Sequence, residues 1–400
     1  MYLFTPNIRH LRAIQAVSLC NSITQASKII HLSQPAITQA IAKMEKLLGI
    51  SIFERSNKGV YETEAGSIFL RRVERALELI KEGAFKAIYI GTNKKVRAQS
   101  DISISVVQLK ALIAVEKSRN YTLAARELCV SQPAVYRAAK DLERVVGTKL
   151  YLTSKDGIEL THAASCLVKF AKLAFSELNQ AFIEIESWHG RDSGFINIGT
   201  MPLAKTNLLP KAITTFSQQC PNVKIQIEDG SYKDLLYGLR HGNIDFLIGA
   251  LRYPTPIDDI LQEPLFEDEL AIVVRSNHPL TQKLSISMKD LASFPWIVPR
   301  EGAPTRDYFN TMLDRNFIEI SHQLVETSSL ALIRNLLHES NRITILSKHQ
   351  VQFEVELNLL TMLPINLPNT ERTIGITFRD SWSPTKTQQI FLQIIRELEQ

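Results

Sequence analysis

"SQPAITQAIAKMEKLLG", residues 33–49, has a counterpart in "SQPAVYRAAKDLERVVG", residues 131–147, at an offset of 98 positions. An ungapped alignment at this offset runs from residue 8 to residue 66 and holds seventeen identities in 59 positions, Glu45/Glu143 and Gly59/Gly157 among them. Most of the other pairs are similar residues. Similarity of this extent without a gap predicts that one domain occurs twice in the chain.

Each copy has the pattern of a winged helix-turn-helix. Apolar residues at helical spacing predict a first helix around residues 11–17, a short second one near 26–30, and a longer third one after a turn. Ser33 is suited to the N-cap of the third helix and Pro35 to its first turn. Its apolar face is predicted to be Ile37, Ile41, Met44 and Leu48, matched by Val135, Ala139, Leu142 and Val146. The next stretch, "ISIFERSNKGVYETEAG", alternates and turns at residues 57–59, which predicts a β-hairpin.

In a winged helix, the third helix enters the major groove of DNA and the hairpin contacts the backbone or the minor groove. The candidate contacts are therefore the polar face of this helix and the wing. They are Ser33, Gln34, Pro35, Thr38, Gln39, Lys43, Arg55 and Lys58 in the first copy, and Gln132, Pro133, Tyr136, Arg137 and Lys140 in the second.

The two copies differ on this surface. Where the first wing has Arg55 and Lys58, the second has Thr153 and Asp156, so two cations that could contact phosphate are absent. Two interpretations of the second copy stay open: a second DNA-binding domain, or a packing module that joins proteins.

The charge of the chain is concentrated in its first part. Residues 1–98 hold 15 Lys and Arg against 7 Asp and Glu, whereas residues 99–190 hold 11 against 10 and residues 191–400 hold 20 against 24. A polyanion is therefore expected to bind the first segment. A length of 400 residues with 45% hydrophobic and 22% charged residues indicates a globular protein of two or three domains.

Several classes of protein are disfavoured. The chain does not begin with a basic segment followed by an apolar one, and no apolar run approaches membrane-spanning length, so a cytoplasmic location is expected. The four cysteines, Cys20, Cys129, Cys166 and Cys220, have neither zinc-site nor disulfide-framework spacing. P-loop, GxGxxG, HExxH and GxSxG motifs are absent, so we expect no catalytic residues, no cofactor and no metal.

Residues 22–66, "SITQASKIIHLSQPAITQAIAKMEKLLGISIFERSNKGVYETEAG", resemble the N-terminal domain of LysR-type transcriptional regulators. The resemblance lies in the Ser-Gln-Pro-Ala start of the third helix, the Leu-Gly that ends it, Phe-x-Arg in the wing and Thr-x-Ala-Gly after it. The second copy keeps Ser-Gln-Pro-Ala but has Tyr151-Leu152-Thr153 for Phe-x-Arg. Without one repeat, 302 residues remain, which is an ordinary length for this family.

A long helix with an apolar stripe is predicted after each wing. The stripes are Ala65, Phe69, Val73, Ala76, Ile80, Ala84 and Ala87 in the first helix, and Leu167, Phe170, Ala174, Leu178, Ala181, Ile185 and Trp188 in the second. Such stripes usually pack on their own domain. The resemblance implies instead that they pair two subunits, which predicts a homodimer or a homotetramer. The polar segment "GTNKKVRAQSDISI", residues 91–104, is predicted to be a tether.

The C-terminal half alternates apolar strands with amphipathic helices, from "FINIGT" to "RTIGITFR", which indicates parallel sheets covered by helices. It resembles the two-lobed effector domain of the same family, similar in architecture to periplasmic solute-binding proteins. The predicted fold class is therefore multidomain, with two winged-helix domains of DNA-binding type and a two-lobed α/β periplasmic-binding-protein-like effector domain. The predicted domains are winged helices at 5–66 and 104–164, linker helices at 67–92 and 165–190, and an effector domain at 194–400, with lobe one at about 194–276 and 366–400 and lobe two at about 277–365.

Ligands of open α/β sheets bind at the carboxyl ends of strands. This rule predicts an effector site at Thr200, Met201, Pro202, Arg252, Arg300, Thr327, Ser328 and Ser329. Thr200 and Ser328 could instead be caps, and the two arginines could be solvated surface charges. The stretch from residue 198 resembles the family branch of the galactose-binding-protein regulator, which implies a sugar, whereas the arginines favour a small carboxylate.

The pattern as a whole predicts a DNA-binding transcriptional regulator of the LysR type that acts on promoter or operator DNA. A small-molecule effector is expected to bind between the two lobes of the C-terminal domain. The alternatives are an enzyme-like protein or a solute-binding protein whose N-terminal repeats serve only for protein interaction.

Overall fold

The computed structural model describes residues 4–94, 103–191, 194–316, 319 and 323–398 of the 400-residue chain. These residues form two compact units, which divide near residue 195. Most of the tether predicted at residues 91–104 lies outside the described residues.

The first unit begins with the predicted winged helix. Its elements are α1 (Ile8–Cys20), α2 (Ile23–Ile30), α3 (Gln34–Leu48), β1 (Phe53–Ser56) and β2 (Gly59–Glu62). The local signals that predicted α3 are confirmed, because the Ser33 hydroxyl accepts a hydrogen bond from the Ala36 N–H and Gly49 ends the helix in the left-handed conformation. The four predicted apolar residues of α3 are buried.

The same order of elements occurs again after residue 103. It comprises α5 (Val106–Ser118), α6 (Tyr121–Leu128), α7 (Gln132–Val146), β3 (Tyr151–Ser154) and β4 (Gly157–Leu160). Val135, Ala139, Leu142 and Val146 are buried, as predicted.

Each wing lies against the turn between the first two helices of its own domain. The Val60 N–H donates to the Asn21 carbonyl oxygen, and the Ile158 N–H donates to that of Arg119. A Cβ atom at Gly59 or Gly157 would lie 2.7 or 2.6 Å from these oxygens, and both glycines have positive φ. Only glycine fits this approach, which explains why it occupies the same position in both copies.

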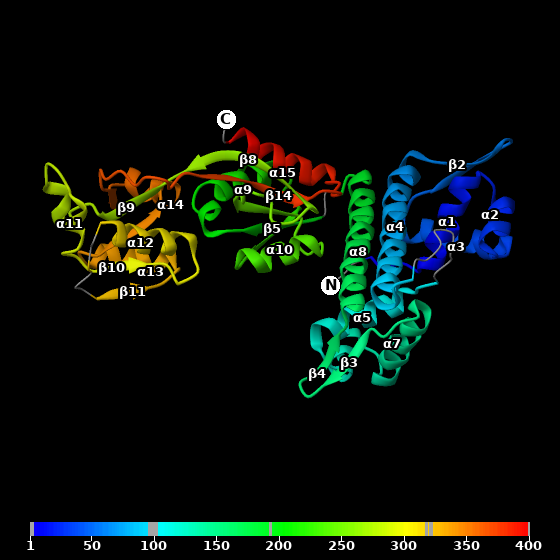
Figure 1. Ribbon diagram of the computed structural model, residues 1–400. Coiled ribbons are helices and arrows are strands. Elements are labelled where there is room, and N and C mark those ends of the chain that lie inside the picture. The colour runs from blue at the N-terminus through cyan, green and yellow to red at the C-terminus, as the bar shows by residue number, and fades with distance from the viewer. Residues whose placement is uncertain (1–3, 95–102, 192–193, 317–318, 320–322, 399–400) are drawn as a thin grey trace. The chain divides into compact units, whose positions relative to one another are not determined.

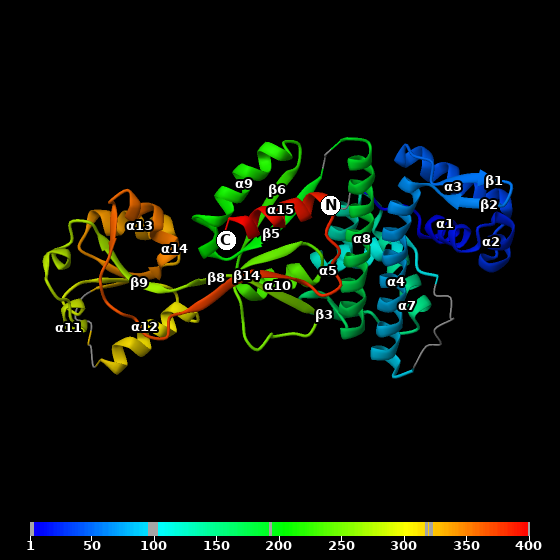
Figure 2. The same ribbon diagram turned by 90° about the horizontal axis from the view of Figure 1, so that it is seen from above.

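The two predicted linker helices, α4 (Glu64–Thr92) and α8 (His162–Trp188), lie side by side in Figures 1 and 2. They are antiparallel, because Arg72 near the start of α4 contacts Glu184 near the end of α8. A Cβ at Gly83, farther along α4, would meet the Phe170 side chain, so the helices approach closely there. The predicted apolar stripes are buried with one exception, Trp188, which is 45% exposed.

This pairing occurs within one chain. The resemblance had implied that the stripes join two subunits, but in the structure each stripe is covered by the other helix of the same chain. The expectation that these stripes form a subunit interface is therefore corrected.

The second unit contains two five-stranded sheets. The first has the order β6-β5-β7-β14-β8, with β5 (Phe195–Thr200), β6 (Lys224–Asp229), β7 (Phe246–Ala250), β8 (Ile260–Asp268) and β14 (Arg372–Arg379). The second has the order β11-β10-β12-β9-β13, with β9 (Leu270–Arg275), β10 (Trp296–Val298), β11 (Leu324–Glu326), β12 (Ile343–Ser347) and β13 (Leu360–Met362). The associated helices are η1 (Pro202–Lys205), α9 (Leu208–Gln219), α10 (Tyr232–Arg240), η2 (Pro279–Gln282), α11 (Met288–Leu291), α12 (Pro304–Arg315), α13 (Leu330–Glu339), α14 (Lys348–Glu356) and α15 (Lys386–Glu397).

Two details of the predicted α/β half are wrong. The sheets are mixed and not parallel, because β14 pairs antiparallel with both β7 and β8, and β9 pairs antiparallel with β12 and β13. The predicted end of the first lobe near residue 276 also fails, since β9 belongs to the second sheet. The chain crosses between sheets at Asp268–Leu270, a step that strand periodicity alone does not reveal.

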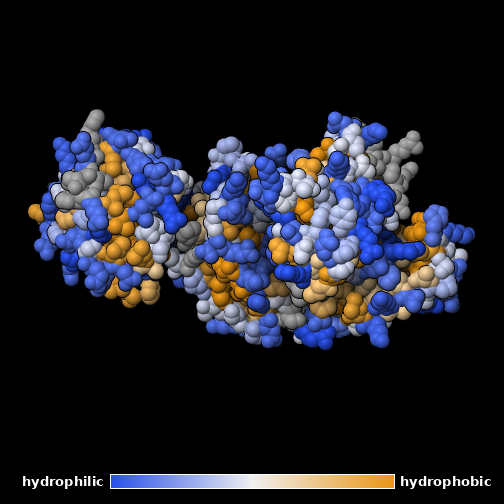
Figure 3. Space-filling view, turned by 90° about the horizontal axis from the view of Figure 1, so that it is seen from below, coloured by the Kyte–Doolittle hydropathy of each residue, from blue (hydrophilic) through white to orange (hydrophobic). Residues whose placement is uncertain are grey.

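Hydrophilic side chains predominate on the face shown in Figure 3, and hydrophobic ones form separate patches, as is usual for folded domains. Within the described part of the chain, no helix combines the length and the apolar character needed to cross a membrane.

Candidate DNA-binding and effector-binding sites

The predicted DNA-binding face of α3 lies on the surface. Gln34, Pro35, Thr38, Gln39 and Lys43 are all exposed, on the side of the helix opposite its buried residues. Ser33 is also exposed, but its hydroxyl caps the helix. Side chains of this kind, near the start of a third helix, can reach base edges in a major groove.

The first wing adds exposed cations to this face. Arg55 lies on β1 and Lys58 in the turn between β1 and β2, and both are exposed. Arg9, which was not singled out from the sequence, adds an exposed positive charge before this face. Burial lowers the pKa of His10, and the charges of Lys43 and Arg9 lower it further, so His10 stays uncharged and the positive potential comes from Lys43 and Arg9. Such a potential attracts phosphate.

One glutamate holds the wing to α3. The Glu45 carboxylate accepts hydrogen bonds from the N–H groups of Ile52 and Phe53, at 2.8 and 3.4 Å. Glu143 does the same for Leu150 and Tyr151, at 2.8 and 3.2 Å. This role was not predicted from the sequence, although the identity of Glu45 and Glu143 in the repeat was a signal for it.

The second winged helix presents fewer free charges. Gln132, Pro133, Tyr136 and Arg137 are exposed on α7. Lys140 is only partly exposed, and its ammonium group pairs with Glu143 at 2.7 Å. The prediction that Lys140 is a DNA contact is therefore weakened, because a phosphate would have to compete with this carboxylate.

The predicted effector residues of the first lobe lie at the ends of neighbouring strands. Thr200 ends β5, and Met201 donates its N–H to the carbonyl oxygen of Ile248 in β7. Pro202 begins η1. Arg252 follows β7 and is exposed, with its guanidinium group 3.8 Å from the ring centre of Tyr232.

Thr200 itself does not line a cavity through its side chain. Its exposed fraction is 0%, and its hydroxyl bonds to the Met201 carbonyl oxygen. The hydroxyl is thus satisfied locally, as the alternative reading of a strand-end cap had allowed. Tyr232 is a better polar candidate, because its hydroxyl is buried and has no hydrogen-bond partner among the described residues.

The second lobe also brings its predicted residues together. Arg300 follows β10, Thr327 follows β11, and the Thr327 N–H bonds to Val298. Arg300 and Ser328 are exposed. Ser329 is the N-cap of α13, where its hydroxyl accepts a hydrogen bond from the Leu332 N–H, and the Thr327 hydroxyl accepts one from the Ser329 N–H. Ser329 therefore has a structural role as a cap.

The two lobes are joined by contacts beside these loops. The Thr206 hydroxyl bonds to the carbonyl oxygen of His349, and the Asn207 amide bonds to Gln352 at 3.2 Å, so the loop after β5 contacts α14. At the crossover, the buried carboxylate of Asp268 binds Ser347 and Arg372.

Asp268 is ionised in this setting. Its burial acts to raise its pKa, but hydrogen bonds from His349 and Ser347 and the charge of Arg372 outweigh the burial and lower the pKa. Ser347 and His349 belong to the second lobe and Arg372 to β14 of the first sheet. One carboxylate therefore ties the two lobes together.

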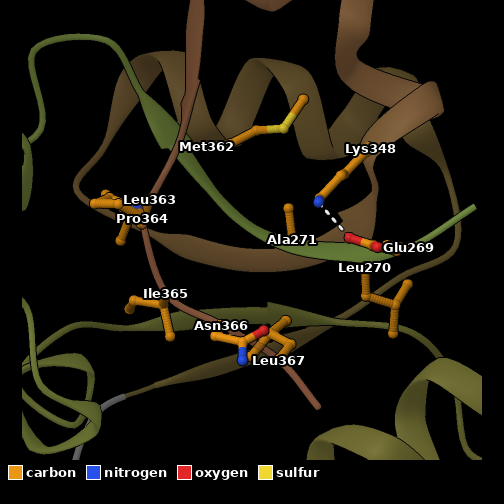
Figure 4. A pocket seen from close by; sticks show the side chains of 10 residues that line it. All are labelled: Glu269, Leu270, Ala271, Lys348, Met362, Leu363, Pro364, Ile365, Asn366 and Leu367. Carbon is orange, nitrogen blue, oxygen red and sulfur yellow. Dashed lines mark hydrogen bonds and ion pairs between the residues drawn. The ribbon is translucent and has the colours of Figure 1, made fainter. Parts of the chain in front are cut away.

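A hollow of about 490 Å³ lies elsewhere on the second lobe. Figure 4 shows it between the start of β9 and the segment that follows β13, with an ion pair between Lys348 and Glu269 on one side. None of the predicted effector residues lines it. Among the described residues, no cluster of His, Cys, Asp and Glu side chains is suited to hold a metal ion.

Comparison with known families agrees with both halves of the chain. Residues 189–400 match the LysR substrate binding domain, and residues 8–67 and 106–165 each match the bacterial regulatory helix-turn-helix protein of the lysR family. The chain is 28% identical to the HTH-type transcriptional regulator GalR of Pseudomonas putida over 393 residues, which are 98% of this chain and 97% of the relative. It is 27% identical to PcaQ of Agrobacterium fabrum over 297 residues, which are 74% of this chain and 96% of that regulator.

Solved structures show the same fold. Full-length OxyR from Pseudomonas aeruginosa has a TM-score of 0.53 and 23% identity, over 74% of this chain and 98% of the other. CbnR, a LysR family transcriptional regulator, has a TM-score of 0.50 and 20% identity, over 73% and 98%. Two segments thus match the helix-turn-helix domain of the family, and the two-lobed α/β half after them matches its substrate-binding domain. The chain is therefore a LysR-type transcriptional regulator with an effector-binding domain, and not an enzyme.

Proposed function

We propose that the first winged helix supplies most of the affinity for operator DNA. The observation that carries this proposal is the exposed face formed by α3 and its wing, where Gln39, Lys43, Arg55 and Lys58 are all free to reach DNA. The second winged helix lacks the two wing cations, and its Lys140 is paired with Glu143. It extends the contact with DNA and adds less affinity.

A gel-shift titration with the DNA upstream of the gene, in rising salt, tests this assignment. Arg55→Ala is expected to weaken binding to all sequences and to flatten the salt dependence by about one unit, because one phosphate contact is lost. Gln39→Ala is expected to cost about 1–3 kcal/mol at particular base pairs only. Arg315→Ala, which removes a positive charge from α12 in the effector half, serves as the control and should leave binding unchanged. Unchanged binding in both Arg55→Ala and Gln39→Ala would contradict the proposal.

We propose further that a small carboxylate binds between the two lobes, touching Arg252 on one and Arg300 on the other. The resemblance to one family branch implied a sugar, and the arginines favoured a small carboxylate. Short polar side chains suit either class of ligand, and Thr200 is buried, whereas both arginines are exposed just after strands. Arginine forms bidentate hydrogen bonds with carboxylates. A ligand of this kind would shift the lobes between two arrangements only by its difference in affinity for them.

A cytoplasmic location and assembly into homodimers or homotetramers fit a regulator of this family. Because α4 and α8 cover each other's apolar stripes, contacts between chains would use other surfaces. We propose also that the effector half is related to periplasmic binding proteins. The two winged helices, in the same proposal, arose by duplication of one domain.

A further inference from the structure

The two winged helices of one chain are related as the two halves of a dimer would be. The end of α4 reaches the second domain, where Gly91 lies against Thr148. The end of α8 reaches the first domain, where the His189 Nε2 atom lies 3.2 Å from the Leu48 carbonyl oxygen. The repeat offset of 98 relates Gly91 to His189, and Thr148 to residue 50, which lies two positions after Leu48. Each long helix therefore ends against the region just after the third helix of the other winged helix, an approximate two-fold relation.

The centre of the helix pair departs from this symmetry. Arg72 of α4 is 1% exposed, and its guanidinium group bonds to Glu177 at 2.8 Å, to Gln180 at 2.8 Å and to both oxygens of Glu184 at 2.6 and 3.2 Å. The repeat places Phe170 where Arg72 would recur in α8. It also places Leu79 and Lys86 of α4 at the positions of Glu177 and Glu184.

These differences decide which helices can pair. If α4 paired with α4 of another copy, Arg72 would face Leu79 and Lys86. If α8 paired with α8, Glu177 and Glu184 would face Phe170. Either arrangement leaves buried charges without a partner, which is costly. Only the pairing of α4 with α8 brings Arg72 together with Glu177 and Glu184. These charges therefore select against α4–α4 and α8–α8 pairs.

We propose that a single chain is a complete DNA-reading pair, in which α4 and α8 of that chain hold two unlike winged helices for a DNA site with two unlike half-sites. This inference rests on the proposed DNA-binding role of the winged helices. The first half-site is read by Gln39 and Lys43 of α3, and the second by Tyr136 and Arg137 of α7. An operator of this protein is therefore not an inverted repeat.

Cross-linking of complementary variants tests whether the pair forms within one chain. The Lys86 ammonium lies 4.8 Å from the ring centre of Phe170, the neighbour of Lys169, so an amine-reactive reagent should join Lys86 to Lys169 in the full-length protein. Lys86→Arg and Lys169→Arg each remove one of the two amines. When both variants are co-expressed, no chain has both amines, and we expect the Lys86–Lys169 cross-link to vanish. Its appearance between co-expressed chains, or its absence from the wild type, would overturn the proposal.

Charge reversal tests whether Arg72 selects the partner. Arg72→Glu should remove most of the cross-link, and the added change Glu184→Arg should restore it. Arg71→Glu is the matched control, because Arg71 is mainly exposed and lies 3.8 Å from the same glutamate. Full cross-linking in Arg72→Glu, or no recovery in the double variant, would show that this cluster does not specify the pair.

Selection from randomised DNA duplexes tests the prediction about the operator. The wild type should enrich a site with two unlike halves. Gln39→Ala should relax preference at one half by about fivefold or more, and Arg137→Ala should do so at the other half only. Enrichment of an inverted repeat, or no effect of Arg137→Ala on either half, would overturn the inference. No enrichment of any sequence would instead contradict the proposed DNA-binding role, while the cross-linking result would still decide the pairing.

Discussion

At the scale of single residues, Asp245 is a buried carboxylate with a perturbed proton affinity. Burial raises the pKa of Asp245 to about 6, although the hydrogen bond from the Asn197 N–H and the charge of Arg379 act to lower it. The folded protein therefore retains a proton that the unfolded chain has lost, and stability should fall as the pH rises from about 4 to about 6. Asp245→Asn should remove this decrease, which amounts to at most about 3 kcal/mol. Denaturant unfolding at several pH values measures this pH dependence of the free energy of unfolding. Asp156→Asn, at an exposed position, is the control. An unchanged pH profile in Asp245→Asn would exclude this role.

At the scale of elements, the wing and the third helix form one piece because Glu45 bonds to Ile52 and Phe53. Glu45→Ala leaves two amides without their charged acceptor and should destabilise the first domain by about 1–3 kcal/mol. Glu45→Gln keeps an acceptor oxygen and should cost less. Hydrogen exchange of the Ile52 and Phe53 amides reports the change, with those of Leu150 and Tyr151 as an internal control. Full protection of Ile52 in Glu45→Ala would mean that Glu45 does not hold the wing.

At the scale of the whole molecule, regulation requires that a ligand bound in one half changes the other, and the first step is binding itself. A thermal-shift screen of small carboxylates, sugar acids and sugars should find a stabilising carboxylate, because a ligand that binds only the folded state raises the melting temperature. Arg252→Ala and Arg300→Ala should each lose most of the shift, and Arg315→Ala should keep it. A carboxylate that stabilises both arginine variants as well as the wild type would mean that it binds elsewhere, and a neutral sugar as the best ligand would reverse the choice of ligand class.

The sequence by itself determined the winged helices, and the reason is local. Ser33, Pro35 and Gly49 act within a turn or two of their own positions, and the apolar face of α3 is set by helical spacing. The repeat fixed the second domain in the same way. The exposed candidates of α3 and the wing could also be predicted, since a helix with one buried face necessarily presents the other to solvent.

Only the tertiary structure decided which apolar stripe covers which, because a stripe is equally compatible with a second subunit and with another helix of its own chain. The choice depends on Arg72 meeting Glu177 and Glu184, which lie more than a hundred residues away in the sequence. The tertiary structure alone also decided that β9 belongs to the second sheet and that Thr200 is buried. Each depends on long-range pairing and packing, to which periodicity within a short segment is insensitive.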